Sequence, residues 1–304
     1  MKTIRVKRGY DLKLVGSPSQ ESIRLDSPTR LALLPEHIPF VKPRLKIEKG
    51  DTVELGSELI EDKRNTDIRF LSPGGGRVAD IRFGPRRVIR EIVIELDETE
   101  KAVEFQRFQE EDIDKTSREQ LVQALVTGGL WPLIKELPFR DYPRADVVPP
   151  ALFVTLGRLE PFQPRPQRYL NGNEALFEYG LKVLRKLAQD RVHVCAHVAD
   201  TEPGGPLSGW VNLAYAGKYP AHDPGVLSYH TKSSPQENQC WFIDGQDVLL
   251  IARLLKDGVY PTERVVSLGG SGMRRRCHAI TRMGAPLSHI AADRTEDGNW
   301  RFIE

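Results

Sequence analysis

The sequence of 304 residues has little cysteine and no long apolar run. Its three cysteines, Cys195, Cys240 and Cys277, lie far apart and without C-x-x-C spacing, so they predict neither a disulfide framework nor an iron–sulfur cluster with its usual four thiolates. No apolar run approaches the ~20 residues with which a helix spans a bilayer. The amino terminus has no continuous hydrophobic stretch of the kind found in secretory signals. We therefore expect a chain that stays in the cytoplasm and crosses no membrane.

Net charge is also small. Lysine and arginine total 44 against 42 aspartate and glutamate, a formal net charge of +2, so no long-range field attracts nucleic acid and none is expected as a partner. The local exception is a basic cluster of Arg274, Arg275 and Arg276. This cluster is either a contact for an anionic partner or, more simply, a solvated loop.

The composition is otherwise that of a folded globular protein, with 39% hydrophobic and 28% charged residues. Residues 1–100 predict a β-rich unit, because short strand-like runs such as 58–61 and 88–96 alternate with tight turns such as 72–76. Short strands at this density make a compact sandwich or barrel. The fold class expected for the whole chain is mixed α/β.

Two further segments flank the predicted α/β domain. Residues 101–146 predict a helical connector, in which Ser117 and Gln120 have the spacing of a capping box. Residues 262–304 predict a small β unit that begins with a strand and a glycine-rich turn.

Residues 147–261 predict a domain of strands alternating with helices, the pattern of an open α/β sheet. The runs 151–156 and 192–199 are expected to be its strands, and 264–268 is expected to continue the same pattern. The first run is almost wholly apolar, as in strands buried on both faces of a parallel sheet. Asn173 is expected to cap the helix between the first two strands.

Lys63 is a candidate carrier lysine. The glycine-bounded run 50–56, the residues around Lys63 and the turn at 72–76 resemble biotinyl and lipoyl carrier domains, in which a lysine on a hairpin turn is acylated with the cofactor. Asp62 and Arg64 depart from the flanking pattern of those carriers. An unmodified carrier-like fold, with Lys63 on an exposed hairpin turn, is favoured over an acylated lysine, because a fold can be reused without its site.

Aromatic residues beside polar groups provide a candidate quinone pocket. Trp210, Tyr229 and His230 offer the apolar faces and hydrogen-bonding groups that a quinone ring needs. Ordinary packing in the core or at the surface is the simpler alternative for each of them.

Metal and nucleotide signatures are weak. His193, Cys195 and His197 share one face of a strand, but the two histidine backbones would be roughly 13 Å apart at the rise of a strand, too far for easy coordination of one ion, so no metal site is expected. The glycine-rich run 269–272 matches neither G-x-G-x-x-G nor a P-loop with its lysine. A plain turn is the preferred interpretation of this run.

Runs along the whole chain resemble the NqrA family, a subunit of the sodium-translocating NADH:quinone reductase. Their order and spacing fit from end to end, which makes the set specific although each run alone is weak. In sequence order they are RGYDL from Arg8, GSPSQ from Gly16, VKP from Val41, EDKRN from Glu61, RRV from Arg86, GLW from Gly129, LPF from Leu137, YPAHDPG from Tyr219, GQDV from Gly245 and RVVSL from Arg264.

The resemblance implies a barrel-sandwich hybrid at the amino end, a Rossmann-like α/β domain, and a small β-grasp element of the soluble-ligand-binding (SLBB-like) type. Members of the family are typically longer, so we expect a carboxy-terminal domain of theirs to be absent here. The resemblance also implies a peripheral protein on the cytoplasmic side of the cell membrane. Its partners would be the other subunits of the pump, above all the membrane subunits, with ubiquinone as a further candidate.

By the same resemblance, the complex passes electrons from NADH to ubiquinone and exports Na⁺, using FAD or FMN and iron–sulfur centres. This chain would carry none of these cofactors and would be inactive alone. Two alternatives from other classes stay open. One is a carrier protein acylated on Lys63, and the other is a free-standing soluble oxidoreductase that binds a nucleotide.

Overall fold

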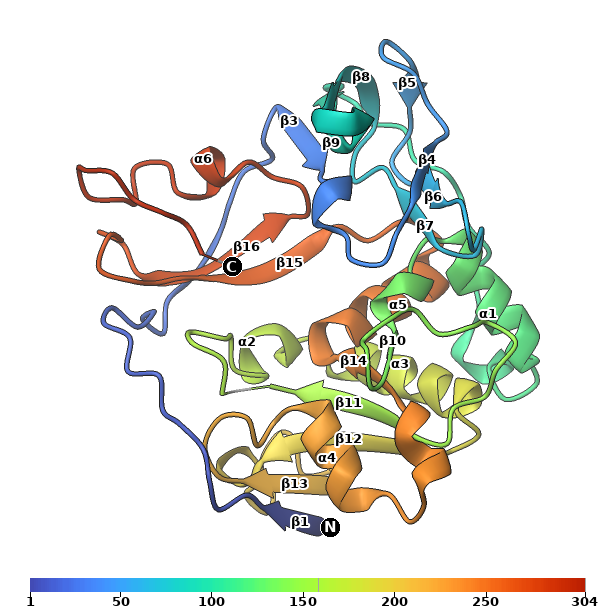
Figure 1. Cartoon of the computed structure of the whole chain (residues 1–304), viewed down its shortest axis with the longest axis vertical. Helices are drawn as coiled ribbons and strands as arrows, with labels where there is room; N and C mark the ends of the chain where they lie inside the picture. Colours follow the sequence, from blue (N-terminus) through green and yellow to red (C-terminus); the bar gives the residue numbers. More distant parts are fainter. Residues whose placement is uncertain (158, 304) are drawn as a thin grey trace.

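The structure is a computed structural model that describes residues 1–157 and 159–303. An α/β layer occupies the lower half of the molecule in Figure 1, a β-rich unit lies above it, and a three-stranded sheet lies alongside both. The mixed α/β class predicted from the sequence is confirmed, with mixed and antiparallel sheets in one chain.

The α/β layer is built on a six-stranded sheet. All its neighbouring strands pair in parallel except the last pair, in which β10 runs antiparallel to β14. In spatial order the strands are β1 (Lys2–Arg5), β13 (Leu213–Ala216), β12 (Val192–His197), β11 (Leu152–Leu156), β14 (Trp241–Asp244) and β10 (Lys135–Glu136). The sequence analysis placed strands at β11 and β12 but did not predict that the amino terminus adds β1 to this sheet.

Both faces of the sheet are buried, because alternate side chains of each parallel strand point to opposite sides. On β11, Leu152 and Val154 join the larger core cluster, whereas Phe153 joins a smaller one. Helices α1 (Arg118–Thr127), α3 (Glu174–Leu187) and α5 (Gly245–Asp257) supply buried residues to the larger cluster, and α4 (Pro224–Thr231) supplies Leu227 to the smaller one.

The predicted helix signals are partly confirmed. Ser117 accepts a hydrogen bond from the Gln120 backbone N–H at 3.2 Å, and the Gln120 side chain accepts one from the Ser117 N–H at 3.0 Å, so the capping box of α1 forms. The cap predicted at Asn173 is wrong in mechanism. Its side chain makes no capping bond to α3 and instead donates to the Tyr169 carbonyl and accepts from Arg253.

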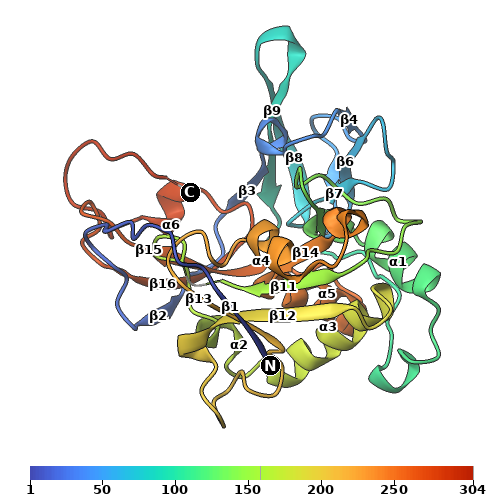
Figure 2. The ribbon, with the colours of Figure 1, turned by 60° about the horizontal axis from the view of Figure 1, so that its bottom comes forward.

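The β-rich unit consists of two antiparallel sheets around a core of its own. One sheet contains β3 (Arg30–Leu33), β9 (Ile89–Leu96), β8 (Gly76–Phe83) and β5 (Thr52–Val53), and the other contains β4 (Pro43–Leu45), β6 (Glu58–Asp62) and β7 (Arg69–Leu71). Strands β8 and β9 form a long hairpin that extends beyond the rest of the molecule in Figure 2.

A separate three-stranded sheet contains β15 (Glu263–Leu268), β16 (Cys277–Arg282) and β2 (Ser22–Arg24). The expectation that 264–268 continues the α/β pattern is wrong, because β15 pairs antiparallel with β16 and with no strand of the six-stranded sheet. Its residues are all only partly buried, unlike those of a strand inside a parallel sheet. The SLBB-like assignment of this element stays a prediction.

The remaining elements are short. Two are single helical turns, α2 (Gln167–Leu170) and α6 (Leu287–Ile290). The 3₁₀ turns are η1 (Pro35–His37), η2 (Pro85–Arg87), η3 (Glu110–Asp112), η4 (Trp131–Leu133), η5 (Val198–Asp200) and η6 (Pro235–Gln239). In the part of the chain that the structure describes, no helix is long and apolar enough to cross a membrane.

Candidate functional site

The crevice at the carboxyl ends of β11 and β14 is where an open parallel sheet usually binds a ligand, because the strand order reverses there. Here the protein's own side chains occupy it. A Cβ at Gly157, directly after β11, would lie 2.2 Å from the side-chain nitrogen of Gln163. A Cβ at Gly245, directly after β14, would lie 2.6 Å from the hydroxyl of Tyr169. The space beside the two glycines is therefore occupied by Gln163 and Tyr169 of the same chain, and Tyr169 is buried.

Partly buried charged residues surround the start of α5, beside this crevice. Asp244 caps the helix by accepting a hydrogen bond from the Gln246 N–H at 2.9 Å. Asp247, in the first turn, forms an ion pair with Arg264 of β15. Burial and the neighbouring Asp247 carboxylate raise the pKa of Asp244 to about 6. Burial likewise lowers the pKa of Lys135 to about 8, against the opposing effect of Asp247.

This cluster connects two sheets. The Gln246 side chain accepts from the Val265 N–H at 3.0 Å and donates to the Val265 carbonyl at 3.1 Å, as a neighbouring strand would. Together with the pair between Asp247 and Arg264, it fixes β15 against the start of α5. We interpret the cluster as a structural joint, because Asp247 is paired with Arg264 and Asp244 is used to cap α5.

A second polar contact lies at the same end of the sheet and was missed from the sequence. His222 is buried, and its Nε2 lies 3.1 Å from Glu160 Oε1 in the loop that follows β11. The next residue, Asp223, caps α4 through the Gly225 N–H at 2.7 Å and pairs with Arg140. The run YPAHDPG contains both His222 and Asp223. Nothing in that run predicts that Glu160 is the residue that contacts His222.

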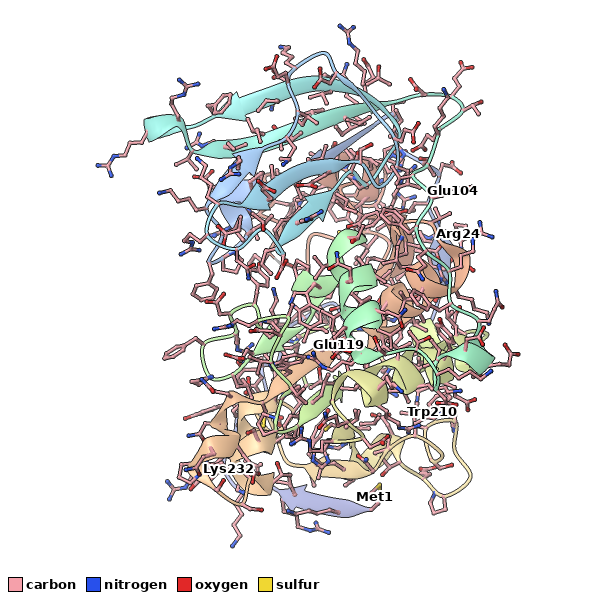
Figure 3. All side chains as sticks on the ribbon, turned by 90° about the vertical axis from the view of Figure 1, so that its right-hand side faces the viewer. Met1, Arg24, Glu104, Glu119, Trp210 and Lys232 are labelled. Atoms are coloured by element: carbon pink, nitrogen blue, oxygen red, sulfur yellow. The ribbon has the colours of Figure 1, made fainter. Side chains whose placement is uncertain are left out.

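The three candidate quinone residues do not form one pocket. Trp210 packs on Phe177 of α3, with ring centroids 5.0 Å apart, and its indole N–H donates to Glu178 at 3.0 Å. Tyr229 and His230 instead lie at the exposed end of α4, just before the labelled Lys232 in Figure 3, where Trp210 lies well away from them. Helices α3 and α4 cover opposite faces of the sheet, so a pocket made of all three residues is excluded.

Lys63 lies where the sequence predicted it. It is exposed in the turn between β6 and β7, and its backbone N–H donates to the Lys42 carbonyl at 2.9 Å. The buried carboxylate of Asp62 shapes the turn, since it accepts from the N–H groups of Lys42 at 3.0 Å and Arg64 at 3.2 Å. Asp62 thus has a structural role beside the exposed lysine.

The basic cluster is largely used within the molecule. Arg275 pairs with Glu21, and Arg274 lies 3.4 Å from Glu296. Arg276 is exposed beside Gly16. An anion contact by all three arginines would first have to separate two ion pairs, so the solvated-loop alternative gains weight.

The remaining motifs have structural roles. In β12, Cys195 is buried, the ring of His193 lies 5.1 Å from that of Phe153, and His197 Nδ1 accepts from the Ala199 N–H. Among the described residues, no three histidine, cysteine or acidic side chains are placed to hold a metal ion. The run 269–272 forms the turn between β15 and β16.

The fold and this site define a class: a β-rich unit of two small sheets joined to a Rossmann-like sheet whose ligand crevice is closed by its own side chains. Comparison with known proteins gives the family. Residues 4–97 match the NqrA N-terminal barrel-sandwich hybrid domain, and residues 116–260 match the NqrA second alpha/beta domain.

Similar proteins extend the match over nearly the whole chain. The chain is 33% identical over 300 residues to the NqrA subunit of the Na(+)-translocating NADH-quinone reductase of Saccharophagus degradans, and 35% identical over 301 residues to that of Pseudomonas aeruginosa strain UCBPP-PA14. Each alignment covers 99% of this chain and 67% of the relative. The chain belongs to the NqrA family of Na⁺-translocating NADH-quinone reductase subunits.

We predict that Lys63 carries no acyl cofactor, because Asp62 and Arg64 depart from the residues that flank the acylated lysine of carrier domains. We expect the intact mass of the protein purified from its native cells to equal the mass of the unmodified sequence. Replacing Lys63 by alanine should change that mass only by the difference in side chains. A larger mass that falls to the unmodified value in Lys63→Ala would contradict this prediction.

The raised pKa of Asp244 predicts a pH-dependent stability. Because this pKa lies above the ~3.9 of an unfolded aspartate, the folded protein binds the proton more tightly between about pH 4 and pH 6, and the free energy of unfolding falls as pH rises through that window. Asparagine still caps a helix but carries no charge. Between about pH 5 and pH 8, the free energy of unfolding of Asp244→Asn should therefore rise by about 1 kcal/mol relative to that of the unsubstituted protein.

Urea unfolding at both pH values measures this difference. The exposed Asp97→Asn serves as control and should show no such gain. An Asp244→Asn effect that is the same at both pH values would show that burial of the charge does not govern it.

Proposed function

We propose that this chain is a subunit of a sodium-pumping NADH:ubiquinone oxidoreductase, peripheral on the cytoplasmic side of the membrane, which supports electron transfer and Na⁺ export without a redox cofactor of its own. The observation that carries the proposal is the family match along 99% of the chain. The names of the relatives describe one subunit of a reductase, and therefore a protein that works in an assembly.

The geometry of the crevice supports a role without a cofactor. In a Rossmann-type site, glycines after a strand let a pyrophosphate approach the backbone. In this chain the space beside Gly157 and Gly245 is taken by Gln163 and Tyr169. A dinucleotide would have to displace a buried tyrosine whose ring is part of the larger core cluster. The alternative of a free-standing nucleotide-dependent oxidoreductase is therefore disfavoured.

An exposed apolar segment supports assembly with other subunits. Between β1 and β2 the chain runs as an extended strap, in which Tyr10 is 76% exposed, Leu12 59%, Leu14 55% and Val15 75%. Four large apolar side chains within six residues are too many for an ordinary solvated loop, and such patches mark interaction sites. We assign the strap to contact with the other subunits of the complex.

Co-purification from native membranes tests the assembly. Tagged chain should bring down the other pump subunits, and the variant Leu12→Ser/Leu14→Ser/Val15→Ser should lose them while keeping its folded circular dichroism spectrum. Leu287→Ser removes a leucine of similar exposure, 56%, from α6 and should retain them. Recovery of the chain without any pump subunit, in its unsubstituted form, would refute the proposed assembly.

The isolated chain should not catalyse the overall reaction. Hydride transfer from NADH followed by single-electron steps needs a flavin or metal relay, which no side chain replaces. We expect no flavin absorbance and no NADH oxidation with a soluble quinone.

Tyr229 and His230 remain proposed quinone contacts, because both are exposed at the end of α4. Another subunit of the pump would supply the rest of that quinone site.

Steady-state NADH oxidation and calorimetric titration with a soluble quinone measure both expectations, and quinone binding should be weak. Turnover by the purified chain that disappears in Tyr229→Ala/His230→Ala would show that the chain is catalytic and would place the quinone site on it. The variant Trp210→Ala, on the other face of the sheet, serves as control.

A further inference from the structure

The tip of the β8–β9 hairpin, residues 82–90, is a surface with no role in the site described above. Its sequence RFGPRRVIR contains four arginines and no acidic residue. Figure 2 shows the hairpin projecting from the β-rich unit into solvent. The tip is convex, and residues 85–88 at its end are all exposed, so a partner can reach them from solvent.

Two of the four arginines have ion-pair partners, and two have none among the described residues. At the base, Arg82 lies 2.7 Å from Glu91 and Arg90 lies 3.2 Å from Glu36. At the end of the tip, Arg86 and Arg87 are exposed and form no ion pair with any residue that the structure describes. The end of the hairpin therefore carries two positive charges that the fold leaves unneutralised.

Apolar side chains flank these charges. Phe83 is 46% exposed and Val88 is 43% exposed. The guanidinium carbon of Arg87 lies 5.8 Å from the centre of the Phe83 ring. Aromatic rings beside arginines at a protruding turn combine an apolar group with charged heads, the combination that favours the boundary between lipid headgroups and acyl chains.

The backbone holds this arrangement in an unfavourable conformation. Arg86 and Arg87 are consecutive and have φ values of 56° and 57°, in the left-handed region that side chains other than glycine rarely adopt. Consecutive residues with positive φ are usual where a β-hairpin turns, because this backbone matches the twist of the two strands. The turn thereby presents two arginines side by side at the extreme end of the hairpin.

The size and shape of the tip decide among partners. A convex surface cannot enclose a small ligand, which needs a concave site. A stable protein interface takes roughly 20–30 residues on each side, many more than the tip offers. A bilayer with anionic headgroups needs no matching shape, and it attracts each nearby arginine with about a fivefold gain in binding.

We propose that the hairpin tip binds the surface of an anionic phospholipid membrane, with Arg86 and Arg87 at the headgroups and Phe83 and Val88 entering the interface. This contact adds to the assembly proposed above and rests on the membrane being near the chain in that complex. It is measured on the chain alone, so its failure leaves the proposed function untouched.

Co-sedimentation of the chain with vesicles tests the proposal. We expect binding to vesicles of phosphatidylglycerol and phosphatidylcholine, and much weaker binding to phosphatidylcholine alone. Arg86→Gln/Arg87→Gln should lower the partition coefficient about 20- to 30-fold, since two fivefold contributions are lost. Arg107→Gln/Arg185→Gln removes the same charge from exposed sites outside the hairpin and should change the partition coefficient far less.

Insertion of the apolar side chains is measured separately. Phe83→Ser/Val88→Ser should weaken vesicle binding without changing its dependence on salt, because the charges remain. A tryptophan placed by Phe83→Trp should be quenched by lipids with brominated chains more strongly than the native tryptophans are.

Three results would overturn the proposal. One is equal binding to neutral and anionic vesicles, and another is an equal loss in the two arginine pairs. The third is unchanged vesicle binding by Arg86→Gln/Arg87→Gln together with lost co-purification of the other pump subunits, which would identify the tip as a protein contact.

Discussion

The parallel sheet of the α/β layer has to be covered on both faces, because its strands have no polar side to present to water. Residues of β11 alternate between the two cores, with Val154 on one side and Phe153 on the other. Helices α3 and α5 lie on the side of the larger core, and α1 packs against both of them. The second face is closed by α4 and by neighbouring strands and loops, among which β1 contributes Ile4.

The same constraint decides which residues can share a site. Trp210 lies beside α3 and Tyr229 lies on α4, so the sheet separates them however close their numbers are. At the carboxyl ends of the strands, loops from both faces lie close together. There the side chain of His222 contacts that of Glu160. The crevice that another sheet of this type would offer to a ligand is filled by Tyr169, whose burial connects α2 to the larger core.

Local signals were predicted well from the sequence, and long-range pairings were not. The capping box at Ser117 and the exposed turn at Lys63 each depend on residues a few positions apart. The partner of β1, by contrast, is more than 200 residues away, and β15 has a strand-like sequence that is compatible with either sheet. The placement of Trp210 away from Tyr229 and His230 was not predictable for the same reason, because aromatic composition does not reveal on which face of a sheet a side chain lies.

Charge that is neutralised inside the molecule can be told apart from charge that is left for a partner. Arg264 and Arg282 both lie at joints: the first pairs with Asp247 of α5, and the second binds both carboxylate oxygens of Glu100 at 2.5 and 2.6 Å. These partly buried pairs attach the three-stranded sheet to its two neighbours, and removing one partner would leave a charge in a poorly solvated place. Arg86 and Arg87 are of the opposite kind, since both are exposed at the end of the hairpin and form no ion pair with any described residue. A chain with nearly balanced charge can therefore still carry local cationic surfaces, which its net charge does not reveal.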